Sequence, residues 1–477
     1  MEEIDHGQEV GKNVAHAKLI FALIIAAVFL DVVDFSIVQV ALPSIQNEFF
    51  APLADVQWVI GAYGITTAGF LMLSGRAGDI YGQKKLFISG IILFVIASFT
   101  GGLAPSLLFL IISRAVQGIG AAITTVTAFA LFIELFPEGR ERNKALGIFV
   151  AVLSAGFAAG AVSGGFLTGT FGWRSVMFIN VPIGIAAAIL LQKYLPSSKG
   201  RLLNAHLDLP GAMTVTTGLI LLVYVLTNAA NVGFSSLQTI LPLASSLFIL
   251  AGFVAIESRS KAPLMPLSFL RRGTILTANI LGLVLASTIV GISFIITIYL
   301  QQILGYSPFY AGLGSLPGAM IFFIVGGWGA SRFVNRYGVR KTLVMSTILI
   351  TIGTALLLTI SANGNYFGIL PGMIVWALGA SIGFPALNIA ALSGTKPGEE
   401  GLASGLINTS TRIGFPLGLA VLLTIATVMT PAQTASGIVT GFRYALIVAA
   451  TLGLLGVFIA SRIKETPKNT GEVVKKH

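Results

Sequence analysis

Long apolar runs separated by short polar loops fill almost the whole chain. The runs are about 20 residues long, enough to cross the ~30 Å of hydrocarbon in a bilayer. We predict fourteen membrane-spanning helices, starting near residues 18, 55, 86, 107, 144, 174, 209, 237, 274, 308, 342, 366, 403 and 439. The loops between them are too short to form soluble domains. The pattern therefore indicates an all-α integral membrane protein.

Composition agrees with this pattern. Of the 477 residues, 55% are hydrophobic and only 10% are charged, whereas soluble domains carry roughly 25% charged residues. The first apolar run, 19–42, is too long for a signal-peptide core, so we expect it to be retained as the first span. The chain has no cysteine, which excludes disulfides and thiolate metal sites.

The net charge of +11 follows a topological pattern. Arg174 and Arg443 are predicted outside, and Arg114 and Arg412 within spans. The other lysines and arginines lie on one side, which the positive-inside rule makes the cytoplasm. We therefore predict a multi-pass protein of the cell (inner) membrane with both termini cytoplasmic. No nucleic acid partner is needed to explain the charge.

Two loops resemble each other, GRAGDIYGQKKLF (75–87) and SRFVNRYGVRKTL (331–343). Aligning Asp79 with Asn335 brings Gly82 onto Gly338, at an offset of eight predicted spans. Because a repeat of two six-helix bundles would give six spans, we infer that two helices are inserted between the bundles. Such repeats place the substrate between the halves, near the midplane. The predicted parts are a cytoplasmic tail 1–17, a bundle 18–195, inserted helices 204–258, a bundle 273–461 and a cytoplasmic tail 462–477.

Two carboxylates lie inside the first apolar run, in FLDVVDFSIVQVALPSI (29–45). The spacing of Asp31 and Asp34 puts both on one helix face. A rise of about 1.5 Å per residue places Asp34 and Arg114 at nearly the same depth. Ionisable residues within the membrane are functional candidates, so we expect Asp31 and Asp34 to carry protons or contact substrate. The alternative is a structural Asp–Arg pair that holds span 1 to span 4, and Arg114 fits either role.

Arg412 lies about nine residues into the thirteenth span, in GLASGLINTSTRIG. It faces either the central cavity or a polar patch with Asn408. In the cavity it would favour anionic or zwitterionic ligands.

Six segments resemble motifs of the major facilitator superfamily, in the right order along the chain. They are GRAGDIYGQKK (75–85), LIISRAVQGIGAA (110–122), GFAAGAVSGG (156–165), VDFSIVQVALPSI (33–45), WRSVMFINVPIG (173–184) and YLQQILGYSPFYAGLGSLP (299–317). The last two are similar to the fourteen-span drug:proton antiporter branch (multidrug efflux type) in particular. The departures are Ala161 for the usual proline of the fifth-span motif, Asn335 for aspartate, and Phe35 and Gln39 in the first span.

The resemblance implies roles for three sets of residues. A conformational latch on the cytoplasmic side would comprise Gly75, Asp79, Gly82, Lys84 and Lys85; the alternative is a turn with a solvated charge cluster. A gating helix seam would comprise Gly156, Gly160, Gly164 and Gly165, for which we expect the tenth span as the partner; plain helix packing is the overlapping alternative. Further cavity contacts by analogy would be Tyr63, Tyr299 and Gln301.

These features predict a proton-coupled exporter of amphipathic drugs or biocides, expected to be cationic, working by alternating access. The alternative is an exporter of a lipid, fatty acid or endogenous metabolite whose anionic head group meets Arg114 and Arg412. We expect no cofactor and no metal, and a monomer in the bilayer whose partners are protons and a small amphipathic substrate.

An enzyme is not expected. The four histidines (6, 16, 206 and 477) lie outside the predicted spans, and the chain has no G-x-x-x-x-G-K-[ST] phosphate loop. A G-x-S-x-G match at 379–383 lies in an apolar helix rather than at a strand-to-helix turn.

Overall fold

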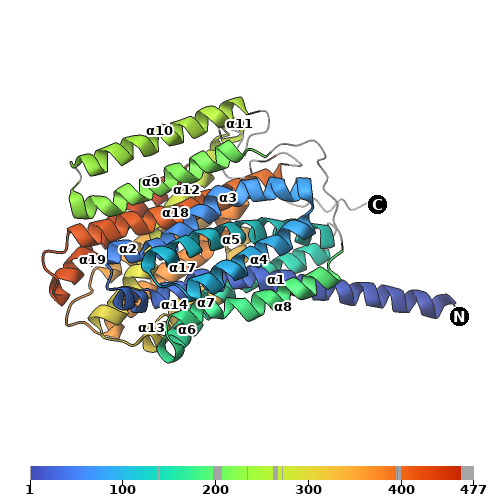
Figure 1. Ribbon diagram of the computed structural model, residues 1–477, viewed down its shortest axis with the longest axis horizontal. Coiled ribbons are helices and arrows are strands. Elements are labelled where there is room, and N and C mark those ends of the chain that lie inside the picture. The colour runs from blue at the N-terminus through green and yellow to red at the C-terminus, as the bar shows by residue number, and fades with distance from the viewer. Residues whose placement is uncertain are drawn as a thin grey trace.

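The computed structural model describes residues 2–136, 140–196, 207–233, 235–260, 267–270, 272–393, 395 and 399–463. These residues form helices and no strand (Figure 1). The N-terminal half comprises α1 (Glu2–Phe49), α2 (Leu53–Val56), α3 (Trp58–Tyr81), α4 (Gln83–Gly102), α5 (Leu107–Leu135), α6 (Arg140–Phe171), α7 (Arg174–Phe178) and α8 (Asn180–Tyr194). The two helices predicted as inserted correspond to α9 (Leu209–Val232) and α10 (Leu237–Arg259).

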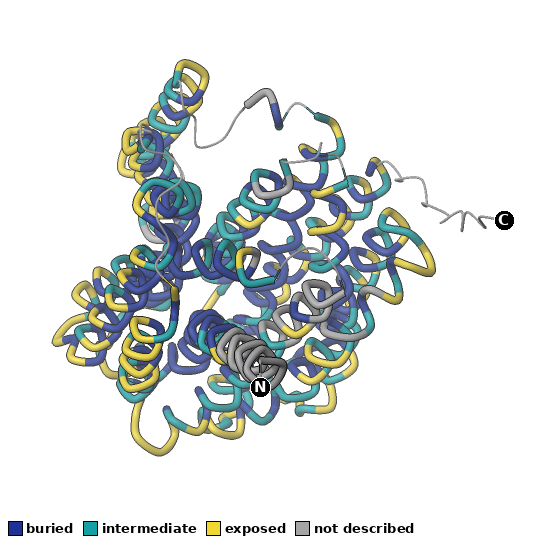
Figure 2. Tube along the Cα trace, turned by 90° about the vertical axis from the view of Figure 1, so that its right-hand side faces the viewer, coloured by how far each residue is buried: buried dark blue, intermediate teal, exposed yellow. Residues whose placement is uncertain are grey.

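The C-terminal half follows α11 (Leu267–Leu270). It comprises α12 (Gly273–Ile298), the π-helical η1 (Tyr299–Ile303), α13 (Pro308–Gly314), α14 (Leu316–Ile321), the π-helical η2 (Phe322–Gly329), α15 (Ala330–Tyr337), α16 (Val339–Leu357), α17 (Tyr366–Leu392), α18 (Glu400–Val428) and α19 (Ala435–Ser461). Figure 2, which looks along the helices, shows exposed positions on the periphery and buried positions inside the bundle.

The span count is compatible with the predicted fourteen. In the described parts of the chain, twelve helices are long and apolar enough to cross a membrane, and the bent pair Pro308–Gly314 and Leu316–Gly326 makes a thirteenth. Helix α6 is not among them, but its 32 residues are also long enough to cross. The predicted N-terminal tail 1–17 is helical from Glu2 and continues without a break into the first span. The predicted C-terminal tail lies outside the described residues from 464 onward.

Side-chain caps mark many of the helix starts. An N-cap side chain accepts a hydrogen bond from a free backbone N–H of the first turn, which fixes where the helix begins. The capping residues with such bonds are Ser106, Asp208, Ser236, Ser307, Asn365 and Thr434. The predicted starts near 107, 209, 237, 308 and 366 coincide with the helices that follow the first five of these caps.

The two repeated loops have the same backbone conformation. Gly82 has φ 94° between α3 and α4, and Gly338 has φ 85° between α15 and α16. A side chain would be strained at either angle, so glycine is required at the junction of both helix pairs. The two glycines that the alignment pairs thus occupy equivalent turns between consecutive helices.

Helix α9 lies against both halves. It contacts α3 and α18, and α10 packs on its outer side (Figure 1). The helices are close: a Cβ on Gly69 of α3 would fall 1.9 Å from the Thr216 hydroxyl of α9. The Thr424 hydroxyl of α18 donates a 2.6 Å hydrogen bond to the Leu226 carbonyl of α9. One inserted helix thus covers the line along which α3 and α18 meet.

Candidate functional site

Asp34 lies at the centre of a fully buried polar network. The Arg114 guanidinium binds its carboxylate at 2.5 Å, and both side chains have no exposed surface. The Gln117 and Asn180 amides donate to the other carboxylate oxygen at 3.0 and 2.6 Å. Asn180 also donates to the Ser98 hydroxyl at 2.9 Å. The encounter of Asp34 with Arg114, expected from their matching depth and from the family resemblance, is confirmed.

Arg114 is held by more than its ion pair. Its Nε donates to the Val59 carbonyl at 3.0 Å, and its guanidinium lies 4.3 Å from the centre of the Tyr63 ring. Close helix packing makes these contacts possible, because a Cβ on Gly118 would fall 2.4 Å from the Tyr63 carbonyl. All of these partners belong to the N-terminal half, so this pair stiffens one half from within.

Asp31 has a different set of partners. One carboxylate oxygen accepts a hydrogen bond from the Tyr63 hydroxyl, and the other accepts from Thr125 at 3.2 Å. The latter oxygen also pairs with Arg412 at 3.0 Å, across 381 residues of sequence. Asp31 is 2% exposed and Arg412 17% exposed. Arg412 therefore faces the interface between the halves.

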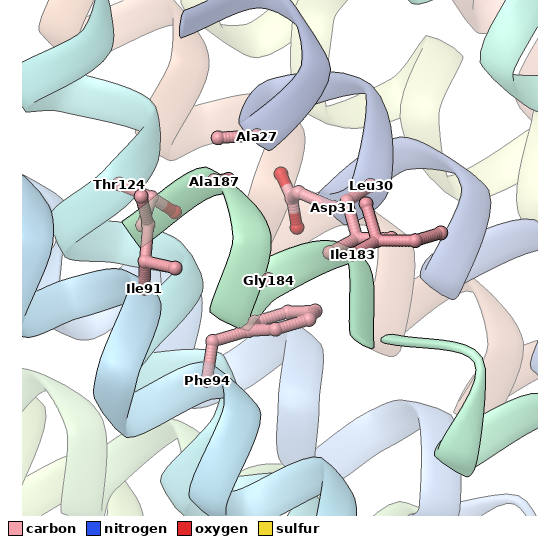
Figure 3. Close-up of a pocket in the computed structure, with 9 residues that line it drawn as sticks. All are labelled: Ala27, Leu30, Asp31, Ile91, Phe94, Thr124, Ile183, Gly184 and Ala187. Atoms are coloured by element: carbon pink, nitrogen blue, oxygen red, sulfur yellow. The ribbon is translucent and has the colours of Figure 1, made fainter. Parts of the chain in front are cut away.

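A small cavity borders Asp31 inside the N-terminal half. Figure 3 shows the Asp31 carboxylate turned toward it, with Thr124 on the opposite wall and the Phe94 ring alongside. The remaining wall is apolar and comes from α1, α4 and α8. Its volume is about 10 Å³, room for about one water molecule. The Asp31 carboxylate thus lies beside a space about the size of one water molecule.

Aromatic rings line the interface next to the two aspartates. Phe35 lies between Tyr63 of its own half and Phe415 of the other, with ring centres 6.3 and 5.4 Å away. Phe384 extends the group, 6.3 Å from Phe415. Such faces attract aromatic and cationic groups. Phe35, one of the departures from the first-span motif, thus contributes to this group.

An open apolar groove lies between α1 and α6, toward the N-terminal end of α1. Its volume is about 500 Å³, within the range typical of ligand pockets. It is lined by Phe21, Ala22, Ile25, Ala26, Phe29, Ile148, Val152 and Ala155.

The predicted gating seam is partly wrong. Cβ atoms on Gly156, Gly160 and Gly164 would fall within 3 Å of α1, so these glycines pack α6 against α1 and not against the tenth span. Gly165 does meet the tenth span: its Cβ would lie 2.6 Å from the Pro308 carbonyl and 3.2 Å from the Gly312 Cα. Glycine spacing indicates close approach but not the partner, and here α6 has two close neighbours on two faces.

The contacts described for the predicted latch lie within the N-terminal half. Lys84 donates to the carbonyls of Gln192 (2.9 Å) and Leu195 at the end of α8. Gln83 donates to Asp79 at 3.0 Å. Gly75 lies at a close contact between α3 and α5, and Gly82 forms the turn between α3 and α4. Lys85 is exposed. A latch between the halves stays a prediction.

Of the three cavity contacts expected by analogy, one lies at the site and two lie elsewhere. Tyr63 belongs to the site, since its hydroxyl binds Asp31 and its ring lies beneath Arg114. Tyr299 donates instead to the Ser361 carbonyl at 2.8 Å, within the C-terminal half. Gln301 donates to the Val40 carbonyl of α1 at 3.0 Å, which joins the halves far along α1 from Asp31.

Several residues of the site were missed from sequence. Gln117 and Asn180 bind Asp34, Thr125 binds Asp31, and Phe415 comes from the opposite half. Gln117 and Asn180 do carry a signal, because each is an amide within an otherwise apolar run. Phe415 carries none, since phenylalanine is common throughout the spans.

A polytopic protein built of two related helical halves, with buried charges at their interface, has the architecture of a secondary transporter. The chain belongs to the Major Facilitator Superfamily, whose family model matches residues 24–419. It is therefore a membrane transporter and not an enzyme.

The relatives and structural neighbours include an export protein, a drug-resistance protein and a sugar transporter. The chain is 33% identical to the cephamycin export protein CmcT of Amycolatopsis lactamdurans, over 98% of both chains. It is 32% identical to the puromycin resistance protein pur8 of Streptomyces alboniger, over 92% of this chain and 89% of that one. The xylose transporter XylE from E. coli, in a partially occluded inward open conformation, has the same fold. That structure gives a TM-score of 0.66 at 14% identity and covers 95% of this chain and 99% of that one.

Proposed function

We propose that the protein exports amphipathic drugs or biocides and that export is driven by protons moving inward. The export and resistance functions named for its relatives support the drug-efflux part. The observation that carries proton coupling is Asp31, a buried carboxylate between the halves, bordered by a cavity and by the partly exposed Arg412. The protein would lie in the inner membrane with both termini cytoplasmic.

In this mechanism, Asp31 takes up a proton when the site faces outward and loses it when substrate binds from the cytoplasm. One charge crossing 100 mV supplies roughly 2.3 kcal/mol. Antiport requires that substrate and proton weaken each other's binding, and that coupling is reciprocal. A cationic group beside a carboxylate disfavours its protonation, whereas an anionic group would not. The coupling thus favours a cationic cargo, whose apolar part the aromatic rings and the groove between α1 and α6 can accept.

The alternative cargo is a lipid, fatty acid or metabolite with an anionic head group. Arg412 is the arginine it could reach, because Arg114 is fully enclosed. The charge class of the cargo separates the two proposals.

The test uses everted vesicles with an acidic interior and a fluorescent pH probe. Tetraphenylphosphonium serves as the cationic cargo and an alkyl sulfonate, which carries no proton, as the anionic one. We expect the cation to dissipate the gradient with the wild-type protein and not with Asp31→Asn. Asp55→Asn, which neutralises an exposed aspartate of α2, is the matched control and should behave like wild type.

A response to the sulfonate alone would favour the anionic alternative. Equal responses in wild type and Asp31→Asn would remove Asp31 from the coupling role. No gradient loss with either probe in any protein would contradict proton-coupled export of these two classes.

A further inference from the structure

The ion pair between Asp31 and Arg412 differs in placement from the pair between Asp34 and Arg114. Asp34 and Arg114 both belong to the N-terminal half, and the pair has no exposed surface. Asp31 lies on α1 and Arg412 on α18, so their pair joins one half to the other. Any motion that separates α1 from α18 must break this pair and leaves the other intact.

The two arginines also differ in how firmly they are held. Arg114 has the Val59 carbonyl and Gln117 as further hydrogen-bond acceptors and stacks on Tyr63. Arg412 retains 17% exposure, so its guanidinium can be hydrated when it leaves Asp31. Breaking a buried pair is costly when a charge is left uncompensated. That cost is lower for Arg412 than for Arg114, and it falls further if Asp31 has lost its own charge.

Among the residues that the structure describes, few charged or titratable groups surround Asp31. They are Tyr63 from α3 and Arg412 from α18, with Asp34 one turn along α1 and Arg114 of α5 beyond the Tyr63 ring. On the cavity side, α4 and α8 present only the side chains of Ile91, Phe94, Ile183 and Ala187 and the backbone of Gly184. Three cations can therefore balance the Asp31 carboxylate, namely Arg412, a proton or a cationic group of the cargo.

We propose that Arg412 is a tethered counter-ion that locks the unloaded transporter, and that a proton or a cationic cargo on Asp31 releases it. This inference rests on the proposed function, because an antiporter must not change conformation while empty. An empty carrier that switches freely returns without cargo, and the proton gradient then runs down with no work done. With Asp31 charged and unloaded, Arg412 keeps α18 on α1. With Asp31 protonated or bound to a cation, the halves are free to move.

The test compares Arg412→Gln with wild type in proteoliposomes that contain no cargo. We expect wild type to hold a pH gradient and Arg412→Gln to dissipate it about 5- to 150-fold faster, the range typical of coupling between two sites. Arg412→Lys keeps the positive charge, so it should hold the pH gradient nearly as long as wild type. Asp31→Asn should show no such leak, because it carries no proton.

The matched control breaks an ion pair within one half. Arg272 and Glu399 bind each other at the starts of α12 and α18, with one hydrogen bond of 3.0 Å. The hydrogen bonds to Glu399 raise the pKa of Arg272 above its ordinary value, so the guanidinium stays charged. Arg272→Gln removes an ion pair that lies within the C-terminal half, without uncoupling the halves, and should hold the gradient.

A conformational measurement makes the inference testable apart from transport. The chain has no native cysteine, so spin labels can be placed on Thr170→Cys and Tyr310→Cys, two exposed positions near the contact between α6 and α13. In wild type we expect one interlabel distance at neutral pH and a second population in acid. Arg412→Gln and Asp31→Asn should each show the second population already at neutral pH.

The outcomes separate the two proposals. Suppose that wild type exchanges tetraphenylphosphonium for protons, while Arg412→Gln leaks protons no faster than wild type and shows the same single interlabel distance. The lock is then overturned and antiport stands. If no protein moves protons, the proposed function fails, and the label distances still report whether Arg412 joins the halves. If Arg412→Gln does not fold, Asp31→Asn decides: a single closed population at neutral pH would contradict the lock.

Discussion

Removing the Arg114 guanidinium should destabilise the protein more than removing any single neutral contact. Arg114→Met keeps most of the side-chain volume but removes the counter-ion of Asp34. The Asp34 carboxylate, which is 0% exposed, is then a buried charge without a cation beside it. Its two amide donors, Gln117 and Asn180, remain. Removing one partner of a buried pair costs about 3–5 kcal/mol, because the other charge stays buried and unpaired. We expect a loss of this size in the free energy of unfolding.

The double variant Asp34→Asn/Arg114→Met should recover most of that loss. It removes both charges, and exchange of a whole buried pair for neutral groups is often close to neutral in stability. The comparison variant is Arg443→Met. It removes the two hydrogen bonds, of 3.0 and 2.6 Å, that Arg443 donates to the Ile360 carbonyl. It should cost only about 1–3 kcal/mol, the penalty for a neutral group left unpaired.

Unfolding by SDS in mixed micelles, followed by tryptophan fluorescence, measures these free energies. The chain has four tryptophans, and none is changed. The reasoning is refuted if the double variant loses as much free energy of unfolding as Asp34→Asn and Arg114→Met lose together as single variants. Additivity would mean that Asp34 and Arg114 act on stability independently, through packing rather than through their charges.

Three further predictions follow from close contacts and ring positions. Gly165→Val should force α6 away from α13, since a Cβ would already lie 2.6 Å from the Pro308 carbonyl; the same spin labels should report a longer distance, and an unchanged distance would contradict the tight seam. Gly82→Ala should cost about 1–3 kcal/mol in the same SDS titration, because its φ of 94° strains a residue with a side chain; an unchanged titration curve would argue against that strain. Phe415→Ala should weaken binding of tetraphenylphosphonium by about 0.5–2 kcal/mol, measured by equilibrium dialysis, and equal affinity would exclude the Phe35–Phe415 group from the site.

Much of the fold could be predicted from sequence because the membrane constrains it. A span has to be apolar over a set length, so its limits are visible in the pattern, and caps such as Ser106 fix its start. Depth is equally predictable, since rise per residue is constant within a helix. For this reason the sequence correctly predicts that Asp34 and Arg114 lie at the same depth.

Rotation of each helix about its own axis could not be predicted in the same way. Arg412 was assigned either to the cavity or to a patch with Asn408, and only packing decides that it meets Asp31. The glycines of α6 show the same limit, because their spacing marks a close approach whose partner depends on how α1 and α13 are arranged around it. Side-chain networks that combine four helices, as at Asn180, are set by tertiary structure.

The position of α9 makes the two contact lines between the halves mechanically unequal. On one side α3 meets α18 beneath α9, which is tied to α18 by the Thr424 hydrogen bond and to α3 by the tight fit at Gly69. On the other side α6 meets α13, and in the part of the chain that the structure describes neither α9 nor α10 makes an extensive contact with them. A motion that opens the first line would also have to break one of these contacts of α9. Opening the second line would break only contacts between the halves themselves, such as that of Gly165 with Pro308. We therefore expect a rocking motion to pivot toward α9, with the wider excursion on the side of α6 and α13.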